Sequence, residues 1–378
     1  MEKLGLYIHI PFCKSKCIYC DFYSLPQQET QPYTDALHRH LRASADMARG
    51  YEVDTVYFGG GTPSCLPAQT LCGLLDTICK SYTISNAAEI TCEANPDSAQ
   101  ELEKLRILRD AGFNRLSLGM QSADDAELRS IGRIHCAADT VRAVEAAHLA
   151  GFDNLSLDLI YGLPSQTMER WTDNLAAAVS LAPEHISCYG LKVEEGTPLH
   201  RMREQYDLPD DDAQADYYLA AVDLLTKAGY TQYEISNFAR LGYRSRHNSK
   251  YWALSPYLGF GPGAHSDFGG ERFAYARSLA AYCAGEAPIE RNIITEWERA
   301  SEYVMLGLRT VDGISLAYLQ NRWGLATAAA EALLCNYAKH GLAQKEAAHY
   351  RLTAHGFLVS NSIILAVSDA LGLTEKDK

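Results

Sequence analysis

Apolar and polar residues alternate in six short segments, which are separated by longer segments of helical periodicity. The alternation predicts β-strands at Leu6–Ile10, Asp54–Phe58, Glu89–Cys92, Arg115–Leu118, Leu155–Ile160 and His185–Tyr189. Apolar residues at helical spacing predict intervening helices, most clearly at Ala68–Cys79, Gln100–Ala111, Ala138–Ala150 and Arg170–Leu181. Three predicted helices end at a glycine, at Gly112, Gly151 and Gly229. Strand–helix repeats of about 30 residues predict βαβ units and a parallel sheet.

This order of elements predicts an α/β fold. The six strand–helix units favour a partial (β/α)6 barrel of the TIM type over a doubly wound sheet, and the sequence leaves open whether the barrel closes. The pattern changes near residue 295. Helices are predicted there at Glu296–Leu308, Leu316–Trp323, Thr327–His340 and Asn361–Ala370, with a short strand at Tyr350–Leu352. We therefore expect a small, mostly helical C-terminal domain, of winged-helix type, after the barrel. The predicted divisions are 1–235 for the barrel, 236–290 for a connecting segment and 291–378 for the C-terminal domain.

The composition narrows the class of protein. The 378 residues are 47% hydrophobic, enough for a sizeable core, and carry a formal net charge of −13. Such an acidic chain is not expected to bind nucleic acid or anionic membranes broadly. No apolar run approaches the roughly 18 residues of a membrane span, and no secretory signal is present. The 11 cysteines therefore predict reduced thiols and a cytoplasmic protein.

Three cysteines near the start, Cys13, Cys17 and Cys20, have the spacing C-x3-C-x2-C. Three thiolates on one short loop can hold three irons of a [4Fe-4S] cluster. The fourth iron then has no protein ligand, an arrangement that suits a cluster which binds and reduces S-adenosylmethionine. The alternatives are a zinc site or three structural thiols. Zinc is disfavoured because its structural sites usually have four ligands in C-x2-C pairs, and no fourth cysteine lies nearby in the sequence.

Polar residues and glycines follow the predicted strands at their carboxyl ends, where chemistry gathers in parallel barrels. The run Gly59–Thr62 follows the second strand, and a ligand can approach a glycine backbone directly, although a plain turn explains such a run equally well. Further rim positions are Glu93, Gln121, Arg133 and Asp158. Carboxylates suit an ammonium group or a ribose diol, and arginine suits a carboxylate, so these residues match the groups of S-adenosylmethionine. For Asp158 a buried ion pair or a capping role is the alternative.

These motifs together resemble the coproporphyrinogen-oxidase-like branch of the radical-SAM family. The resemblance spans nearly the whole chain and rests on Tyr7–Cys13, Gly59–Pro63, Gln121, Arg133 and Asp158–Pro164. It implies a radical-SAM core in the barrel, with a [4Fe-4S] cluster on the three cysteines. It also implies S-adenosylmethionine contacts from Tyr7, Tyr19, Gly60, Gly61, Thr62, Glu93, Gln121, Arg133 and Asp158.

Two groups within this branch differ in function. The oxygen-independent coproporphyrinogen III oxidases carry a further cysteine two residues after the third ligand, where this chain has Phe22. They also have a longer segment before the cluster, whereas only twelve residues precede Cys13. Both departures disfavour decarboxylase activity and leave cleavage of S-adenosylmethionine open.

The second group, the HemW-type haem chaperones, carries an H-N-x-x-Y-W motif, which is present here as His247–Trp252. A histidine nitrogen can bind haem iron, and Tyr251 and Trp252 offer flat faces for a porphyrin. Arg244 and Arg246 could pair with haem propionates. The alternative is a turn that buries two aromatic rings, with a histidine that is only hydrogen-bonded.

We therefore expect a protein that binds haem as cargo and hands it to acceptor haemoproteins, respiratory enzymes among them. The competing hypothesis is an oxygen-independent coproporphyrinogen III oxidase, which converts its substrate to protoporphyrinogen IX by radical decarboxylation. A third hypothesis is a cluster-bearing scaffold without a haem site.

Overall fold

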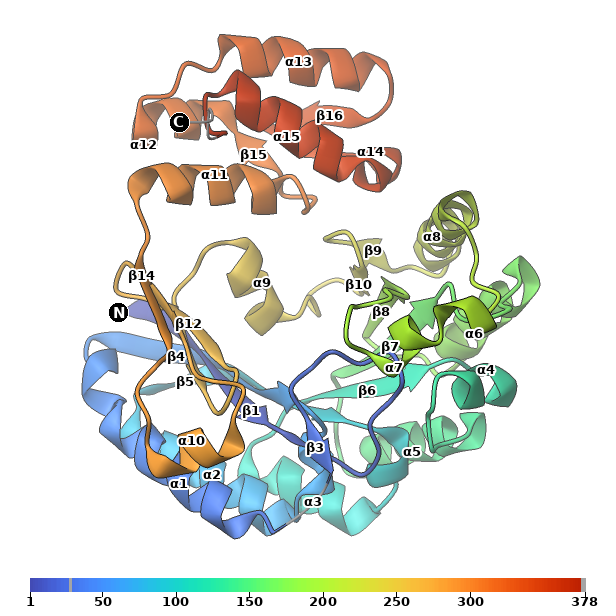
Figure 1. Cartoon of the computed structure of the whole chain (residues 1–378), viewed down its shortest axis with the longest axis vertical. Helices are drawn as coiled ribbons and strands as arrows, with labels where there is room; N and C mark the ends of the chain where they lie inside the picture. The colour runs from blue at the N-terminus through green and yellow to red at the C-terminus, as the bar shows by residue number, and fades with distance from the viewer. Residues whose placement is uncertain (27–28, 375–378) are drawn as a thin grey trace.

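The structure is a computed structural model and describes residues 1–26 and 29–374. Its central feature is a 12-stranded sheet. Seven of these strands are parallel and adjacent: β11 (Tyr257–Phe260), β1 (Glu2–Ile10), β4 (Tyr51–Gly60), β5 (Ile84–Ala94), β6 (Arg115–Gln121), β7 (Leu155–Tyr161) and β8 (His185–Gly190). They curve into a partial barrel whose open side faces the C-terminal domain (Figure 1). The predicted α/β fold with a partial barrel is confirmed.

Antiparallel strands extend both edges of this sheet. One edge carries β10 (Asn237–Ala239) and β9 (Thr231–Gln232), and the other carries β12 (His265–Phe268), β13 (Glu271–Ala274) and β14 (Glu290–Ile293). Residues from 237 to 274 thus supply four strands of the sheet. The predicted domain boundaries at 235 and 290 stay predictions.

Helices cover the outer face of the barrel (Figure 1). They are α1 (Gln31–Ala43), α2 (Ala68–Ser81), α3 (Leu102–Ala111), α4 (Asp125–Ser130), α5 (Ala137–Leu149), α6 (Met168–Ser180) and α8 (Asp211–Lys227). The shorter α7 (Pro198–Arg201) and α10 (Leu279–Ala284) lie in connections, and β2 (Phe12–Cys13) pairs with β3 (Leu25–Pro26). Gly112 ends α3 with φ of 114°, a left-handed conformation that glycine adopts without strain.

Alternation along the strands gives the barrel two different faces. Val56 and Phe58 of β4 and Leu157 of β7 are buried in the large apolar cluster beneath the outer helices. The residues between them, such as Tyr57 and Asp158, point to the inner face, which is rich in polar and ionisable groups. The sheet therefore separates an apolar layer outside from a polar interior inside, where the candidate site is built.

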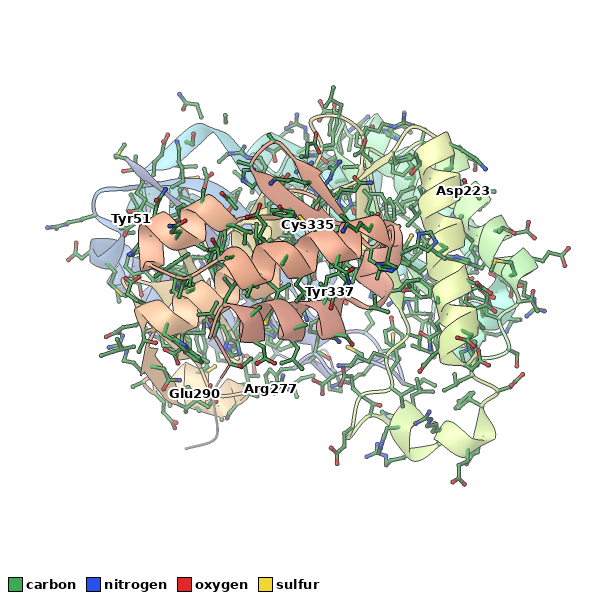
Figure 2. The ribbon with its side chains drawn as sticks, turned by 90° about the horizontal axis from the view of Figure 1, so that it is seen from above. Tyr51, Asp223, Arg277, Glu290, Cys335 and Tyr337 are labelled. Atoms are coloured by element: carbon green, nitrogen blue, oxygen red, sulfur yellow. The ribbon has the colours of Figure 1, made fainter. Side chains whose placement is uncertain are left out.

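The C-terminal domain has its own apolar cluster. It consists of α11 (Glu296–Gly307), α12 (Leu316–Trp323), α13 (Ala328–Lys339), α14 (Ala354–Leu358) and α15 (Ser360–Ala370), with a small sheet of β15 (Ile314–Ser315), β17 (His349–Leu352) and β16 (Ala343–Glu346). Figure 2 shows these helices stacked over the barrel, with α8 and its Asp223 beside them. The expected small, mostly helical domain is present.

One short helix, α9 (Arg246–Trp252), lies between the barrel and the C-terminal domain (Figure 1). It carries the H-N-x-x-Y-W motif. No helix in the described ranges is both long and apolar enough to cross a membrane.

Candidate functional site

The loop that carries Cys13, Cys17 and Cys20 leaves β1 at the carboxyl end of the parallel strands. Hydrogen bonds hold it on several sides. The backbone N–H of Ile18 donates to the Ile131 carbonyl at 3.2 Å, and a 2.9 Å bond joins the His9 ring to the Tyr23 carbonyl. The loop is thus fixed at the rim of the barrel, where the sequence predicts it.

The three thiols have the chemistry that a cluster needs. None of the 11 cysteines forms a disulfide. Burial raises the pKa of the Cys20 thiol, and the neighbouring Cys17 and Cys13 thiols raise it further, against a backbone hydrogen bond that lowers it. Bound iron would offset the cost of this concentrated negative charge. Among the described residues no three His, Cys, Asp or Glu side chains are already arranged as a metal site. The donor set fits an iron–sulfur cluster, and its final geometry would form on binding.

A chain of hydrogen bonds connects two of these cysteines beneath the loop. The Thr62 hydroxyl donates to Cys13 Sγ at 3.4 Å and accepts from Asn95 Nδ2 at 3.0 Å. Arg133 Nη2 donates to Asn95 Oδ1 at 2.7 Å, and its Nη1 donates to Cys17 Sγ at 3.6 Å. Two predicted contact residues, Thr62 and Arg133, are thereby placed beside the cysteines. A guanidinium so near the sulfurs stabilises thiolates.

The glycine run packs tightly against β1. A Cβ atom on Gly61 would lie 2.7 Å from the carbonyl oxygens of Ile10 and Phe12, and one on Gly60 would lie 2.4 Å from the His9 ring. The N–H of Gly61 donates to the Ile10 carbonyl at 2.8 Å. Glycine is thus required here for contact between neighbouring strands, in addition to any approach by a ligand.

Glu93 lies next to this run. It accepts the Tyr57 hydroxyl at 2.7 Å and the Gly60 N–H at 3.0 Å. Burial raises the pKa of its carboxyl to about 7; these two hydrogen bonds oppose the rise, and the negative charge of Asp158 adds to it. A cationic ligand in this interior would favour the ionised form.

Asp158 is held by three hydroxyls from three strands. Its carboxylate accepts Ser117 Oγ at 2.9 Å, Ser187 Oγ at 2.7 Å and Ser156 Oγ at 3.3 Å. These serines offset part of the cost of an acidic group inside a barrel. The carboxylate is therefore fixed on the inner face of the barrel.

The other predicted contact residues lie around the same interior. The Tyr7 hydroxyl shares a 3.0 Å hydrogen bond with the His9 ring, and the Tyr7 ring stacks on Tyr57 with centroids 6.2 Å apart. Tyr19 lies beside Cys17, since a hydrogen bond joins the two side chains. Gln121 ends β6 with φ of 63°, in the left-handed region.

The motif helix α9 lies elsewhere, against the inner face in the amino-terminal half of the strands. Ser245 caps it. His247 is 0% exposed; its Nδ1 shares a 2.9 Å hydrogen bond with Thr55 Oγ1 and its Nε2 shares a 2.8 Å hydrogen bond with the Tyr251 hydroxyl. Burial lowers the pKa of His247 to about 3, helped by the positive charges of Lys250 and Arg115. The imidazole is neutral at physiological pH, but neither ring nitrogen is free in this conformation.

The neighbouring motif residues are also engaged. Arg244 pairs with Asp312 of the C-terminal domain at 3.1 Å, and Arg246 pairs with Asp54 at 3.4 Å. Trp252 is half-buried. The motif and the cysteine loop are therefore two separate regions, joined across the interior by Tyr7, whose ring stacks on His247 at 6.4 Å.

A cavity of about 600 Å³ opens beside the cysteine loop. Its lining includes Tyr23, Leu25, Tyr33, Leu279 and Cys283. Its volume lies within the range of ligand and cofactor sites. Nothing in the sequence pattern points to this cavity, because its walls come from two regions far apart in the chain, near residues 23–33 and at residues 278–283.

Sequence reasoning missed several polar residues that shape these regions. Asn95 lies directly after the end of β5, two residues beyond Glu93, so its position at the end of a predicted strand was readable from the sequence. Ser117 and Ser187 face Asp158 only because of the strand register, which a single sequence does not give.

Two family models match the chain. Residues 7–177 match the radical SAM superfamily, and residues 294–359 match the HemN C-terminal domain. The first match covers the cysteine loop and the strands through β7. Membership of the radical-SAM superfamily implies a [4Fe-4S] cluster and S-adenosylmethionine.

Similar proteins extend the match over nearly the whole chain. The haem chaperone HemW of Haemophilus influenzae is 35% identical over 376 residues, which cover 96% of this chain and 97% of the relative. HemW of Bacillus subtilis is 35% identical over 368 residues, covering 94% and 97%. Among solved structures, the radical SAM enzyme coproporphyrinogen III oxidase, HemN, of Escherichia coli superposes with a TM-score of 0.84 at 25% identity, covering 97% of this chain and 90% of that one. The chain therefore belongs to the HemW family of radical-SAM proteins.

Proposed function

We propose that this protein binds haem and transfers it to acceptor haemoproteins. The observation that carries the proposal is the match, end to end, with curated haem chaperones. The motif helix α9 supports it, because burial keeps His247 neutral, and neutral imidazole is the form that binds iron. For His247 to act as the ligand, the Tyr251 hydroxyl must first leave Nε2. Tyr251 and Trp252 would then contact the porphyrin.

We also propose a resident cluster and S-adenosylmethionine site at the rim. Cys13, Cys17 and Cys20 would hold the cluster, which supplies an open iron position. The contacts to S-adenosylmethionine would come from Tyr7, Tyr19, Gly60, Gly61, Thr62, Glu93, Gln121, Arg133 and Asp158. The bonds from Thr62 and Arg133 to cysteine sulfur support this grouping. Acceptors of the haem would include respiratory enzymes, and 11 cysteines without a disulfide support a location in the cytoplasm.

The second candidate function is coproporphyrinogen III oxidation, favoured by the superposition on HemN. Against it, Phe22 occupies the position of the fourth cysteine of those oxidases and is 67% exposed. Conversion of coproporphyrinogen III to protoporphyrinogen IX by the reconstituted protein, with matching release of 5′-deoxyadenosine, would establish this second function.

The direct test is a haem titration of the anaerobically reconstituted full chain, followed by its absorption spectrum. We expect saturable binding by wild type and a lost or shifted Soret band in His247→Ala. The matched control is His355→Ala, on the surface of α14, which should bind haem as wild type does. Unchanged haem binding in His247→Ala would show that His247 is not the iron ligand. The cavity beside Tyr23 and Cys283 would then be the alternative haem site. Absence of haem binding by wild type would refute the proposal.

A further inference from the structure

The amino-terminal end of α9 is held by a distant carboxylate. Glu89 of β5 accepts the backbone N–H groups of Arg246 and His247, each at 3.0 Å. These are among the helix's otherwise unsatisfied N–H groups, and a negative charge stabilises that end of a helix. Glu89 is buried. It therefore fixes the backbone of the motif histidine itself.

A buried ion pair holds the other side of the helix. Lys250 Nζ lies 2.7 Å from Asp54 Oδ1, and the two side chains are only 8% and 13% exposed. Removing one partner of such a pair leaves an uncompensated buried charge, which is strongly unfavourable. Together Glu89 and Asp54 keep His247 turned into the barrel.

A buried arginine close to this contact is left without partners. Arg115 is 1% exposed, and its Nε and Nη1 have no hydrogen-bond partner. Arg115 pairs with Thr91 of the neighbouring strand, two residues after Glu89, and Glu89 is the carboxylate that acts on it most strongly. Buried, unpaired guanidinium donors cost free energy, so the closed arrangement of α9 carries an unsatisfied group.

Glu89 thus has two competing uses. In the structure it caps α9, while the unpaired Arg115 lies within its electrostatic reach. If α9 moves away, Glu89 loses two N–H partners and becomes free to pair with Arg115. Glu89 would then have two arrangements, one bound to the N–H groups of α9 and one paired with Arg115, and these two arrangements make a two-state element.

We propose that Glu89 and Arg115 are positioning residues that set how readily α9 withdraws and presents His247 to haem. The inference rests on the proposed haem-binding function. Arg115 would favour the open arrangement, in which it gains a partner, and the Asp54–Lys250 pair would favour the closed one. This proposal also explains why Arg115 has nitrogens without hydrogen-bond partners in an interior where most polar groups have them.

The test measures hydrogen exchange of the backbone amides of residues 246–252, and haem affinity separately, in the reconstituted full chain. In Arg115→Met the closed state no longer buries guanidinium donors that lack hydrogen-bond partners. We expect slower exchange in α9 and a haem Kd raised about tenfold, the change produced by a shift of one decade in the closed–open equilibrium. Arg115→Lys, which keeps the charge, should restore both values toward wild type.

Asp54→Asn is the opposite change and should speed exchange in α9 and lower the haem Kd. Its matched control is Asp223→Asn, which breaks an exposed pair with Lys227 on α8 (Figure 2) and should alter neither value. Slower α9 exchange in Arg115→Met with faster exchange in Asp54→Asn supports the inference. Unchanged or faster exchange in Arg115→Met overturns it, and if that variant does not fold, unchanged exchange in Asp54→Asn overturns it. Exchange is measured without haem, so wild type that binds no haem refutes the proposed function alone.

Discussion

Single residues in the barrel interior have their ionisation set by burial. The pKa of Glu93 is raised and that of His247 is lowered. Both shifts have the same cause, because burial disfavours the charged form of each side chain. Hydroxyls satisfy Asp158, and N–H groups satisfy Glu89. The interior thus holds acidic groups without a matching set of ion pairs, an environment suited to a cationic ligand.

Glu93 gives a pH dependence of stability that can be measured. Its pKa is about 7 in the folded chain against an ordinary 4.5, so the native state binds more protons between these values. Stability therefore falls as pH rises from 4.5 to 7, by on the order of 3 kcal/mol for this group. In protein without ligands, Glu93→Gln should lose this part of the slope in urea unfolding at pH 5 and pH 8. An identical slope in the variant would contradict the assignment.

His247 gives the opposite dependence. Its folded-state pKa of about 3 lies below the ordinary 6.5, so the unfolded chain binds the extra proton in this range. The contribution of His247 to the stability of the fold is therefore present above pH 6.5 and is lost as the pH falls below 6.5. His247→Gln should show a flatter decline in stability than wild type between pH 6.5 and pH 5, measured by urea unfolding. An unchanged decline in the variant would show that the folded ring takes up protons as readily as the unfolded one.

The positions of several candidate rim residues were predictable at this scale because they lie at the ends of predicted strands. Cys13 and Glu93 follow such strands and Asp158 lies near the end of one, while their roles stay predictions. The burial of His247 was not predictable, because it depends on where α9 docks against Thr55 and Glu89, residues that are far away in the sequence. The position of Asn95 was readable, but its hydrogen bonds were not, because its partners Thr62 and Arg133 come from different loops.

At the scale of elements, the four helices α2, α3, α5 and α6 were predicted to within two residues of their ends because their apolar positions repeat regularly. The six strands were located by their alternation but extend further than predicted, and β5 begins at Ile84, five residues before the predicted start. The missed strand β11 has only four residues and pairs with β1 in parallel from the far side. So short a segment, rich in glycine and aromatic residues, has no distinct periodicity. The contact between β1 and the glycine run after β4 likewise depends on strand packing.

That contact predicts a sharp difference between two glycine substitutions. Gly61→Ala would place a methyl group 2.7 Å from backbone oxygens that cannot move without shifting β1 and the cysteine loop. We expect it to lose most of its cluster, measured as iron and sulfide content after reconstitution. Gly73→Ala, in α2 with open space around it, should keep its cluster and gain about 0.5–1 kcal/mol in stability. Full cluster content in Gly61→Ala would contradict this account of the rim.

At the scale of the whole molecule, the barrel and the C-terminal domain have separate apolar clusters. Contacts between them include the Arg244–Asp312 pair beside α9 and Tyr218 of α8, which packs into the C-terminal cluster. The motif helix α9 thus lies where the barrel and the C-terminal domain meet. Movement of one part relative to the other would change the contacts of α9.

Separate cores predict separable stability. Leu334 of α13 is completely buried in the C-terminal cluster. Leu334→Ala should cost about 2–5 kcal/mol, and the loss should appear as faster hydrogen exchange in residues 296–370. Exchange in β4 to β7 should stay near the wild-type rate. A uniform acceleration across the barrel strands would show instead that the two parts unfold as one unit.

The central claim, that the protein carries haem to acceptors, is tested most directly by transfer. Haem-loaded protein, freed of unbound haem, is mixed with membranes from haem-starved bacteria, and the recovered activity of a haem-dependent respiratory enzyme is followed over time. We expect faster recovery than with free haem at the same concentration. His247→Ala should either fail to load haem or, when loaded, give slower recovery than wild type. Recovery no faster than with free haem would contradict the central claim.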